Sequence, residues 1–204
     1  MLELDRVLTK IHSVRIRALY PFHFVGRGIS IHYTCEIHKA TAKWVSIGNQ
    51  VFLGKDVWIN VVIEGDKSFL PRIIIENGCK IGRRSVISAK QSIKLEENVM
   101  LAPSVLIMDH NHDYSNPDEP ISQQGTTGGG RIVIERNCWL GYGSVILCDS
   151  GELVLGRNCV VGANAVVKHS FPPYSVIAGN PARLVRQYDR ISGKWQKVNA
   201  ANQP

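Results

Sequence analysis

Aliphatic residues return every six positions along most of the chain, in short blocks separated by irregular intervals. The positions that follow this period are Ile47, Leu53 and Ile59; Ile75, Ile81 and Ile87; Leu95, Leu101 and Ile107; Ile134, Leu140 and Ile146; and Leu155, Val161 and Val167. Neither the period of an α-helix nor the alternation of a β-strand produces this interval. It predicts an all-β solenoid, in which short parallel strands are joined by a corner after every six residues.

Two further positions of the six-residue unit also carry a pattern. The fourth residue after the aliphatic position is small or medium-sized in most units, and it is cysteine at Cys79, Cys138 and Cys159. We expect these side chains to point inward, which makes the three cysteines small buried residues. The residue directly after the aliphatic position is often glycine, as at Gly48 and Gly82. We expect these glycines to supply the unusual backbone angles of the corners.

The two ends of the chain do not follow the six-residue period. Apolar residues from Leu4 to Ala18 recur at helical spacing and predict a helix that stops before Pro21, with its apolar stripe packed on the main body. Leu184, Tyr188, Ile191 and Trp195 show the same spacing and predict a second helix near the C-terminus.

The expected organisation therefore has three parts. A helix and lead-in occupy residues 1–44, the solenoid occupies residues 45–182, and a basic helix or tail occupies residues 183–204. The interval from Ile59 to Ile75 is longer than two repeats, and it predicts a bulged corner around residues 65–67.

The net charge of +7 is concentrated at the two ends of the chain. Residues 1–27 carry five basic and two acidic side chains, and residues 183–204 carry five basic and one acidic, whereas the middle is neutral. A nucleic-acid-binding protein would spread basic residues over its folded surface, so we expect no nucleic-acid partner. The basic ends are either solvated surfaces or contacts for an anionic membrane or an anionic ligand.

Three features of the sequence favour a cytoplasmic protein. No apolar run approaches the roughly 20 residues of a membrane-spanning helix. The first residues lack the basic and apolar regions of a secretory signal. The five cysteines are odd in number and contain no CxxC pair, so we expect reduced thiols.

Three stretches link the chain to a known family: Ile134-Glu-Arg-Asn-Cys-Trp-Leu-Gly141, Val161-Gly-Ala-Asn-Ala-Val-Val167 and Pro172-Pro-Tyr-Ser-Val-Ile-Ala-Gly-Asn-Pro-Ala-Arg183. Over residues 45–186 the chain resembles the hexapeptide-repeat acyltransferases, which implies a left-handed parallel β-helix. It looks most like the branch of maltose and galactoside acetyltransferases and of the O-acetyltransferases of lipopolysaccharide and capsule synthesis. The Asp109-His-Asn-His112 sequence points to the surface-polysaccharide members.

The period is interrupted between Ile107 and Ile134 by a polar segment that contains His110 and His112. An excursion this long within a compact fold is usually functional or disordered, and the two histidines favour a functional loop over residues 109–131. The resemblance implies that the loop closes over a neighbouring subunit's groove, with a catalytic histidine at its base. It therefore also implies a homotrimer with active sites between subunits.

Acetyl transfer to a sugar needs a base, because a hydroxyl is a poor nucleophile at neutral pH, and histidine is the natural choice. The resemblance implies His112, nine residues after Pro103, as this base, with His110 as the second candidate. It also implies the backbone N–H of Tyr142 as the oxyanion donor and the side chain of Trp139 as one wall of the binding groove. An exposed polar pair is the alternative interpretation of the two histidines.

The resemblance further implies acetyl-CoA as the acetyl donor. Gly162 and Ala163 would line the groove for the pantetheine arm, and Lys168 and Arg183 would contact the phosphates. A plain surface lysine is the alternative interpretation of Lys168. We expect no metal, because a zinc site would need three convergent histidines.

These observations lead to one expected function and two alternatives. We expect an acetyl-CoA-dependent O-acetyltransferase that acts on a sugar hydroxyl of a surface-polysaccharide or lipid-linked glycan precursor, in the cytoplasm or at the inner face of the membrane. The first alternative is N-acetylation of an amino or nucleotide sugar at the same site. The second is a non-catalytic β-helix scaffold or sugar-binding module.

Overall fold

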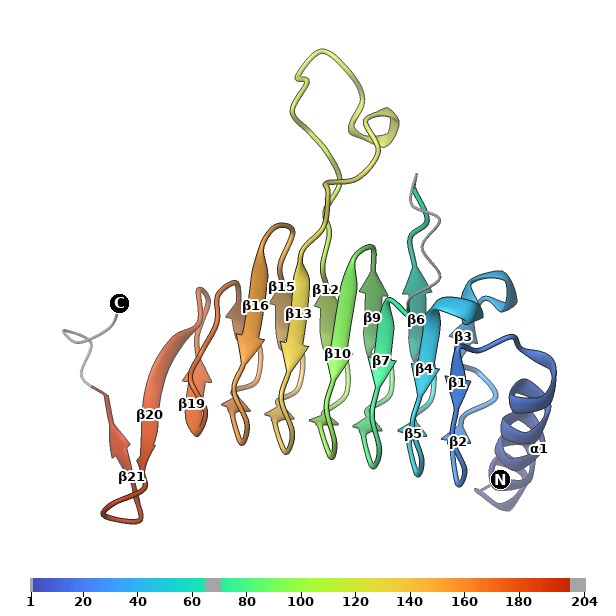
Figure 1. Cartoon of the computed structure of the whole chain (residues 1–204), viewed down its shortest axis with the longest axis horizontal. Helices are drawn as coiled ribbons and strands as arrows, with labels where there is room; N and C mark the ends of the chain where they lie inside the picture. The colour runs from blue at the N-terminus through green and yellow to red at the C-terminus, as the bar shows by residue number, and fades with distance from the viewer. Residues whose placement is uncertain (1, 65–70, 199–204) are drawn as a thin grey trace.

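The computed structural model describes residues 2–64 and 71–198, which form a parallel β-helix with one α-helix, α1 (Leu2–Leu19), at its N-terminal end (Figure 1). Successive strands pass through three sheets in turn, and three strands complete one coil. The bulged corner expected at residues 65–67 lies outside the described residues. Within the described ranges, no helix has the length and apolar character needed to cross a membrane.

The strands of the three sheets have the following bounds. Sheet A consists of β1 (Phe24–Val25), β4 (Val45–Ile47), β7 (Ile73–Ile75), β10 (Ser92–Leu95), β13 (Arg131–Ile134) and β16 (Glu152–Leu155). Sheet B consists of β2 (Ser30–Ile31), β5 (Phe52–Leu53), β8 (Lys80–Ile81), β11 (Met100–Leu101), β14 (Trp139–Leu140), β17 (Val160–Val161), β19 (Ser175–Ala178), β20 (Arg183–Asp189) and β21 (Lys194–Lys197). Sheet C consists of β3 (Glu36–Ile37), β6 (Trp58–Val61), β9 (Val86–Ala89), β12 (Leu106–Met108), β15 (Val145–Leu147) and β18 (Val166–Val167).

The six-residue period places one column of aliphatic side chains inside each sheet. In sheet C, for example, Ile59 lies in register with Ile87, which in turn lies in register with Ile107. The predicted aliphatic positions are all buried, and none is more than 2% exposed. The three cysteines that stand four residues after an aliphatic position are buried as well, as predicted. Aliphatic side chains of successive coils therefore stack on one another and form a continuous apolar core that every coil extends.

The glycines after the aliphatic positions have a different role from the one expected. Positive φ angles occur instead two residues later, for example at Gln50 and Arg84. A Cβ at Gly82 would lie 2.5 Å from the carbonyl carbon of Ala102, and one at Gly48 would lie 2.7 Å from a backbone nitrogen of the next coil. The expectation of unusual corner angles at these glycines was therefore wrong: they allow the backbones of stacked coils to approach closely.

The first coil begins before residue 45, where the sequence placed only a lead-in. Val25, Ile31 and Ile37 already occupy the three aliphatic columns, since they pair with the corresponding residues of the second coil. A 3₁₀-helix, η1 (Lys39–Trp44), is inserted after this coil. The insertion breaks the six-residue spacing, which hid the first coil from the period.

The predicted C-terminal helix is wrong, because residues 183–197 form the antiparallel hairpin of β20 and β21. Strand β20 pairs with the free edge of β19, so the backbone groups at this edge of sheet B gain hydrogen-bond partners. A helix at the same place would leave those groups unpaired. The ring of Tyr188 lies 5.3 Å from that of Trp195 and 6.2 Å from that of Tyr174, centroid to centroid. Cross-strand aromatic contacts of this kind stabilise a hairpin.

Helix α1 forms as predicted, but it packs through a different face. Ile16 is buried in the core, and the hydroxyl of Ser13 accepts a hydrogen bond of 2.9 Å from the backbone N–H of Ile31 in the first coil. Ser13 thereby satisfies a donor on the otherwise open edge of sheet B. The apolar stripe, which we expected to contact the body, is exposed instead at residues such as Val7 and Ile11.

The close approach of the coils can be tested with a matched pair of substitutions. Gly82→Ala should lower the free energy of unfolding by about 1–3 kcal/mol, because its Cβ would meet the backbone of Ala102. Gly128→Ala should change it by less than about 0.5 kcal/mol, because no atom lies within 4 Å of the added carbon. Urea denaturation of both variants measures the difference, and equal losses would contradict the account.

Candidate active site

The loop between β12 and β13 leaves the coil where sheet C turns into sheet A, and it projects away from the body (Figure 1). We call the turns from sheet C to sheet A the C–A corner, and the turns from sheet B to sheet C the B–C corner. Asp109 is the first residue after β12, so the loop begins with the Asp109-His110-Asn111-His112 sequence.

Asp109 is fully buried at the C–A corner, where its carboxylate accepts three backbone hydrogen bonds. The donors are the N–H groups of Lys90, Gln91 and Ser92 in the preceding coil, at distances of 2.6, 2.9 and 2.8 Å. Sequence reasoning assigned no role to Asp109, although its position beside a histidine was a usable signal. The carboxylate therefore fixes the corner of the preceding coil and can still accept a hydrogen bond from a fourth donor.

That fourth donor is His110, which is only 8% exposed. Its Nδ1 lies 2.9 Å from Oδ1 of Asp109. An ionised carboxylate can only accept hydrogen bonds, so Nδ1 carries the proton and Nε2 of the neutral ring is left as an acceptor. A buried carboxylate that orients an imidazole in this way is the arrangement that general-base histidines use.

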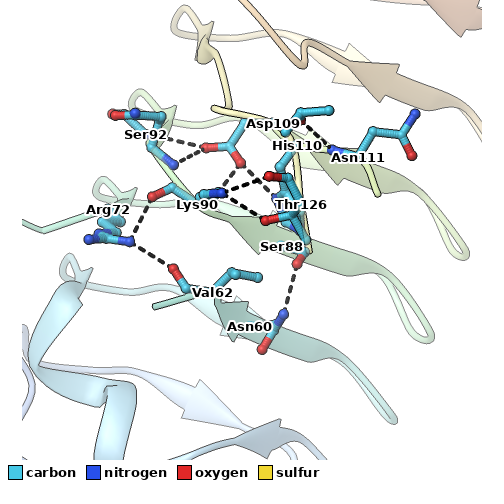
Figure 2. A network of polar contacts seen from close by, with 12 residues as sticks. Asn60, Val62, Arg72, Ser88, Lys90, Ser92, Asp109, His110, Asn111 and Thr126 are labelled. Atoms are coloured by element: carbon cyan, nitrogen blue, oxygen red, sulfur yellow. Dashed lines mark hydrogen bonds and ion pairs between the residues drawn. The ribbon is translucent and has the colours of Figure 1, made fainter. Parts of the chain in front are cut away.

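The base of the loop is held by a second set of polar contacts (Figure 2). The ammonium group of Lys90 contacts the carboxylate of Glu64 at 2.8 Å and the hydroxyl of Thr126 at 2.8 Å. Thr126 lies on the returning strand of the loop, and its backbone forms a β-bridge with His112. Both arms of the loop are therefore fixed to the coil where they leave it.

A cavity of about 260 Å³ opens beside His110 at the C–A corner. Its lining consists of His110, Asn111, Leu147, Cys148, Asp149, Ser150, Glu152 and Lys168. The nine-residue interval from Ile146 to Leu155 supplies most of these residues, because its extra length widens the corner of the next coil. The structure therefore brings Lys168 to the same cavity as His110.

His112 occupies a different environment from His110. Its side chain is exposed on the loop, and the described residues offer its imidazole no hydrogen-bond partner. The backbone N–H of His112 donates to the side-chain oxygen of Asn111 at 3.0 Å. A loop that closed against another surface could still bring this imidazole into a site.

The remaining candidate residues lie on the other edge of sheet C, at the B–C corner. Tyr142 lies in the turn from β14 to β15, and Gly162 and Ala163 lie in the turn from β17 to β18. Arg183 follows Ala182, whose N–H bonds to the carbonyl of Val166 at the start of β18. Trp139, on β14 just before this corner, is 45% exposed. Within one chain, these residues do not meet His110 or Lys168.

Tyr142 has the properties of a backbone donor. Its side chain is half exposed at the B–C corner, and its N–H is not used by any hydrogen bond found among the described residues. Its carbonyl is engaged, since it accepts from the N–H of Asn164 at 2.8 Å in the next coil. The turn is therefore fixed while its N–H points at no partner, which suits stabilisation of a developing negative charge.

The chain matches the sequence model of a repeat family over residues 72–103 and 131–169, described as "Hexapeptide repeat of succinyl-transferase". The two matched segments lie on either side of the loop and cover the coils whose aliphatic columns are described above. The coils in the matched segments are therefore similar to hexapeptide repeats.

Two curated proteins are similar to this chain. It is 32% identical over 118 residues to "Putative lipopolysaccharide biosynthesis O-acetyl transferase WbbJ" of Escherichia coli K12, which covers 55% of the chain and 59% of that protein. It is 29% identical over 164 residues to "Probable acetyltransferase Rv3034c" of Mycobacterium tuberculosis, which covers 80% of the chain and 49% of that protein. The matches thus span only about half to three-fifths of the length of these relatives.

Solved structures share the fold at low sequence identity. AntD, an N-acyltransferase from Bacillus cereus in complex with dTDP and 3-hydroxybutyryl-CoA, has a TM-score of 0.68 at 18% identity, with 88% of this chain and 90% of AntD covered. A maltose O-acetyltransferase from Clostridium difficile 630 has a TM-score of 0.51 at 22% identity, covering 92% of this chain and 86% of that one. These likenesses bear out the left-handed parallel β-helix that the family resemblance implied.

No group of three histidine, cysteine or acidic side chains that could hold a metal ion occurs in the part of the chain that the structure describes. The ionisable side chains that line the cavity at the C–A corner are those of His110, Cys148, Asp149, Glu152 and Lys168.

The structural role of Asp109 can be separated from its neighbours by substitution. Asp109→Ala should lower the free energy of unfolding by about 2–4 kcal/mol, because three backbone N–H groups would lose their partner in a buried corner. Asp113→Ala should cost less than about 1 kcal/mol, because that carboxylate accepts from its neighbours Tyr114 and Ser115 in a solvent-accessible turn of the loop. Chemical denaturation measures both, and a smaller loss for Asp109→Ala would contradict the geometry.

Proposed function

We propose that the chain is an acetyl-CoA-dependent O-acetyltransferase that acts on a sugar hydroxyl. The observation that carries the proposal is the buried Asp109–His110 pair, which opens onto a cavity at the base of the loop. The similarity to a lipopolysaccharide O-acetyltransferase supports a surface-polysaccharide or lipid-linked glycan precursor as the acceptor.

In the proposed reaction, His110 moves one proton twice. Its free Nε2 accepts the proton of the sugar hydroxyl while the oxygen attacks the carbonyl carbon of the thioester. The carbon–sulfur bond then breaks, and the imidazolium returns the proton to the departing sulfur, so that acetyl ester and CoA are the products. Asp109 holds the ring in the tautomer that the first step needs and stabilises the imidazolium that forms.

The geometry supports His110 as the base in place of His112, to which the family resemblance assigns the role. His110 is oriented by a carboxylate and faces a cavity, whereas the ring of His112 is exposed and has no orienting group among the described residues. A base that is fixed before the substrate arrives loses little freedom in the transition state. His112, the first candidate from the sequence, thus becomes the second candidate in this proposal.

The other residues would serve the acetyl donor. The unused N–H of Tyr142 would stabilise the oxyanion, and the glycine turn at Gly162 and Ala163 would give the pantetheine arm a path along the B–C corner. The exposed cations Lys168 and Arg183 would contact the phosphates, and Trp139 would form an apolar wall.

The two corners imply that a complete site needs two copies of the chain. His110 and Lys168 lie at the C–A corner, while Tyr142 and Ala163 lie at the opposite edge of sheet C. A cyclic assembly would bring one edge of each copy against the other edge of its neighbour, and the resemblance to the acyltransferases implies three copies. We therefore propose a homotrimer with active sites between subunits.

An acetyl-transfer assay would distinguish two other functions from this one. Acetylation of an amino or nucleotide sugar would use the same base, and N-acyltransferases such as AntD share this fold. A non-catalytic scaffold or sugar-binding module would bind ligands without turnover. The buried, reduced thiols fit a cytoplasmic protein, and the basic ends extend the proposal to the inner face of an anionic membrane.

Paired histidine variants test the mechanism. His110→Ala should lower kcat by about 10²–10⁴-fold, the usual contribution of a general base, while CoA affinity changes little. His112→Ala should lower kcat by less than about tenfold, because no carboxylate orients that ring. Release of CoA from acetyl-CoA with panels of neutral and amino sugars measures kcat and separates O- from N-transfer.

Three results would contradict this proposal. An inactive His112→Ala variant beside an active His110→Ala variant would transfer the role of base to the exposed loop. Full activity in both variants would remove the base from this loop altogether. Sugar binding without any acetyl transfer by the wild type would favour the non-catalytic module.

Mixed oligomers test the division of the site between copies. His110→Ala disables the C–A corner, and Ala163→Trp at an exposed position should block the B–C corner. Co-expressing both variants should restore about one quarter of the wild-type activity, because about one interface in four then joins two intact edges. His110→Ala with Asp109→Asn is the control, since both alter the same corner and no interface can recover. Restoration by the control pair, or none by the first pair, would contradict a shared site.

A further inference from the structure

Helix α1 presents an apolar face that the rest of the described chain leaves uncovered. Leu4 is 63% exposed, Val7 54%, Ile11 59% and Val14 65%, and these residues recur every three or four positions along one side of the helix. Leu8 and Leu19 widen the face and are also exposed. Single exposed aliphatic residues are normal, but an apolar stripe of this length, which is interrupted by the exposed Arg15, marks an interaction surface.

Helix α1 is attached to the coil through its opposite side. Ser13 and Ile16 make the buried contacts with the first coil, and the hydroxyl of Tyr33 donates to Asp5 at 2.9 Å. The helix lies across the N-terminal end of the coil, beyond β1 and β2 (Figure 1). Its apolar side therefore points away from the body.

A basic edge runs along α1 beside the apolar face. Arg6, Lys10 and Arg17 line a groove of about 550 Å³ between the helix and the first coil, together with the exposed ring of Phe52. The one acidic group in this lining, Asp5, is already engaged by Tyr33. The groove thus offers cations and apolar surface side by side.

We propose that α1 is the docking surface of this protein for an anionic lipid bilayer. The apolar face would enter the boundary between headgroups and acyl chains, while Arg6, Lys10 and Arg17 would contact the phosphates of the headgroups. An amphipathic helix with leucine and isoleucine on one side and basic residues along its edge is suited to lie in this plane. A second copy of the chain fits the same face less well, because pairing two such helices would bring their basic edges together.

Docking through α1 would hold the proposed enzyme at a bilayer, and it does not depend on the chemistry of the active site. It also distinguishes between the two basic ends of the sequence. The C-terminal hairpin of β20 and β21 lies at the other end of the coil from α1 (Figure 1). The hairpin's basic residues therefore serve as an internal control.

Vesicle sedimentation of the full chain tests the proposal with three matched variants. The vesicles contain phosphatidylcholine alone or with roughly 30% phosphatidylglycerol. The first variant carries Val7→Ser, Ile11→Ser and Val14→Ser. The second carries Arg6→Gln, Lys10→Gln and Arg17→Gln. The control removes three positive charges from the hairpin by Arg186→Gln, Arg190→Gln and Lys194→Gln.

The wild type and the hairpin control should bind the anionic vesicles within about twofold of each other, and both should bind neutral vesicles weakly. The two α1 variants should bind the anionic vesicles at least about tenfold less tightly, since each basic group near such a surface is worth about fivefold. Acetyl transfer to a soluble sugar should be unchanged in both α1 variants, which separates this inference from the proposed function. Circular dichroism confirms that each variant is folded.

Three outcomes would overturn the proposal. The first is a wild type that does not bind anionic vesicles. The second is a hairpin control that loses binding while the α1 variants keep it. The third is a smaller particle in sedimentation velocity for the serine variant than for the wild type, because a second copy of the chain would then cover this face.

Discussion

Coil-to-coil register is the constraint on which the rest of this structure depends. Each parallel strand pairs with the strand of the same sheet in the coils before and after it, so aliphatic residues such as Ile59, Ile87 and Ile107 form one column. A slip of one residue would turn every column outward. The register also fixes where corners fall, and it therefore decides that Asp109 meets the backbone of residues 90–92 and that Tyr142 lies on another edge.

The sequence predicted the columns well because the six-residue period is local and repeats many times. It failed where a neighbouring coil or strand determines the outcome. The role of Gly82 depends on the backbone of Ala102, one coil away, and the hairpin of residues 183–197 depends on the free edge of β19. A helical spacing of apolar residues cannot reveal either contact, because tertiary pairing overrides local preference.

The candidate site was predicted only in part, because contacts between neighbouring coils also determine its geometry. The interruption of the period located the loop and both histidines, but the sequence alone could not distinguish the buried His110 from the exposed His112. That difference arises because three N–H groups of the preceding coil hold the Asp109 carboxylate beside His110. Similarly, Lys168 and Arg183 carry the same charge, yet the fold sends them to different corners.

The most direct measurement of the central claim is a crystal structure of the oligomer with bound CoA. The account predicts that the CoA sulfur lies within hydrogen-bond reach of Nε2 of His110 in one copy. It further predicts that the pantetheine arm follows the corner of Tyr142 and Ala163 in the neighbouring copy. CoA bound within a single copy, or with its sulfur far from His110, would contradict both the choice of base and the division of the site between corners.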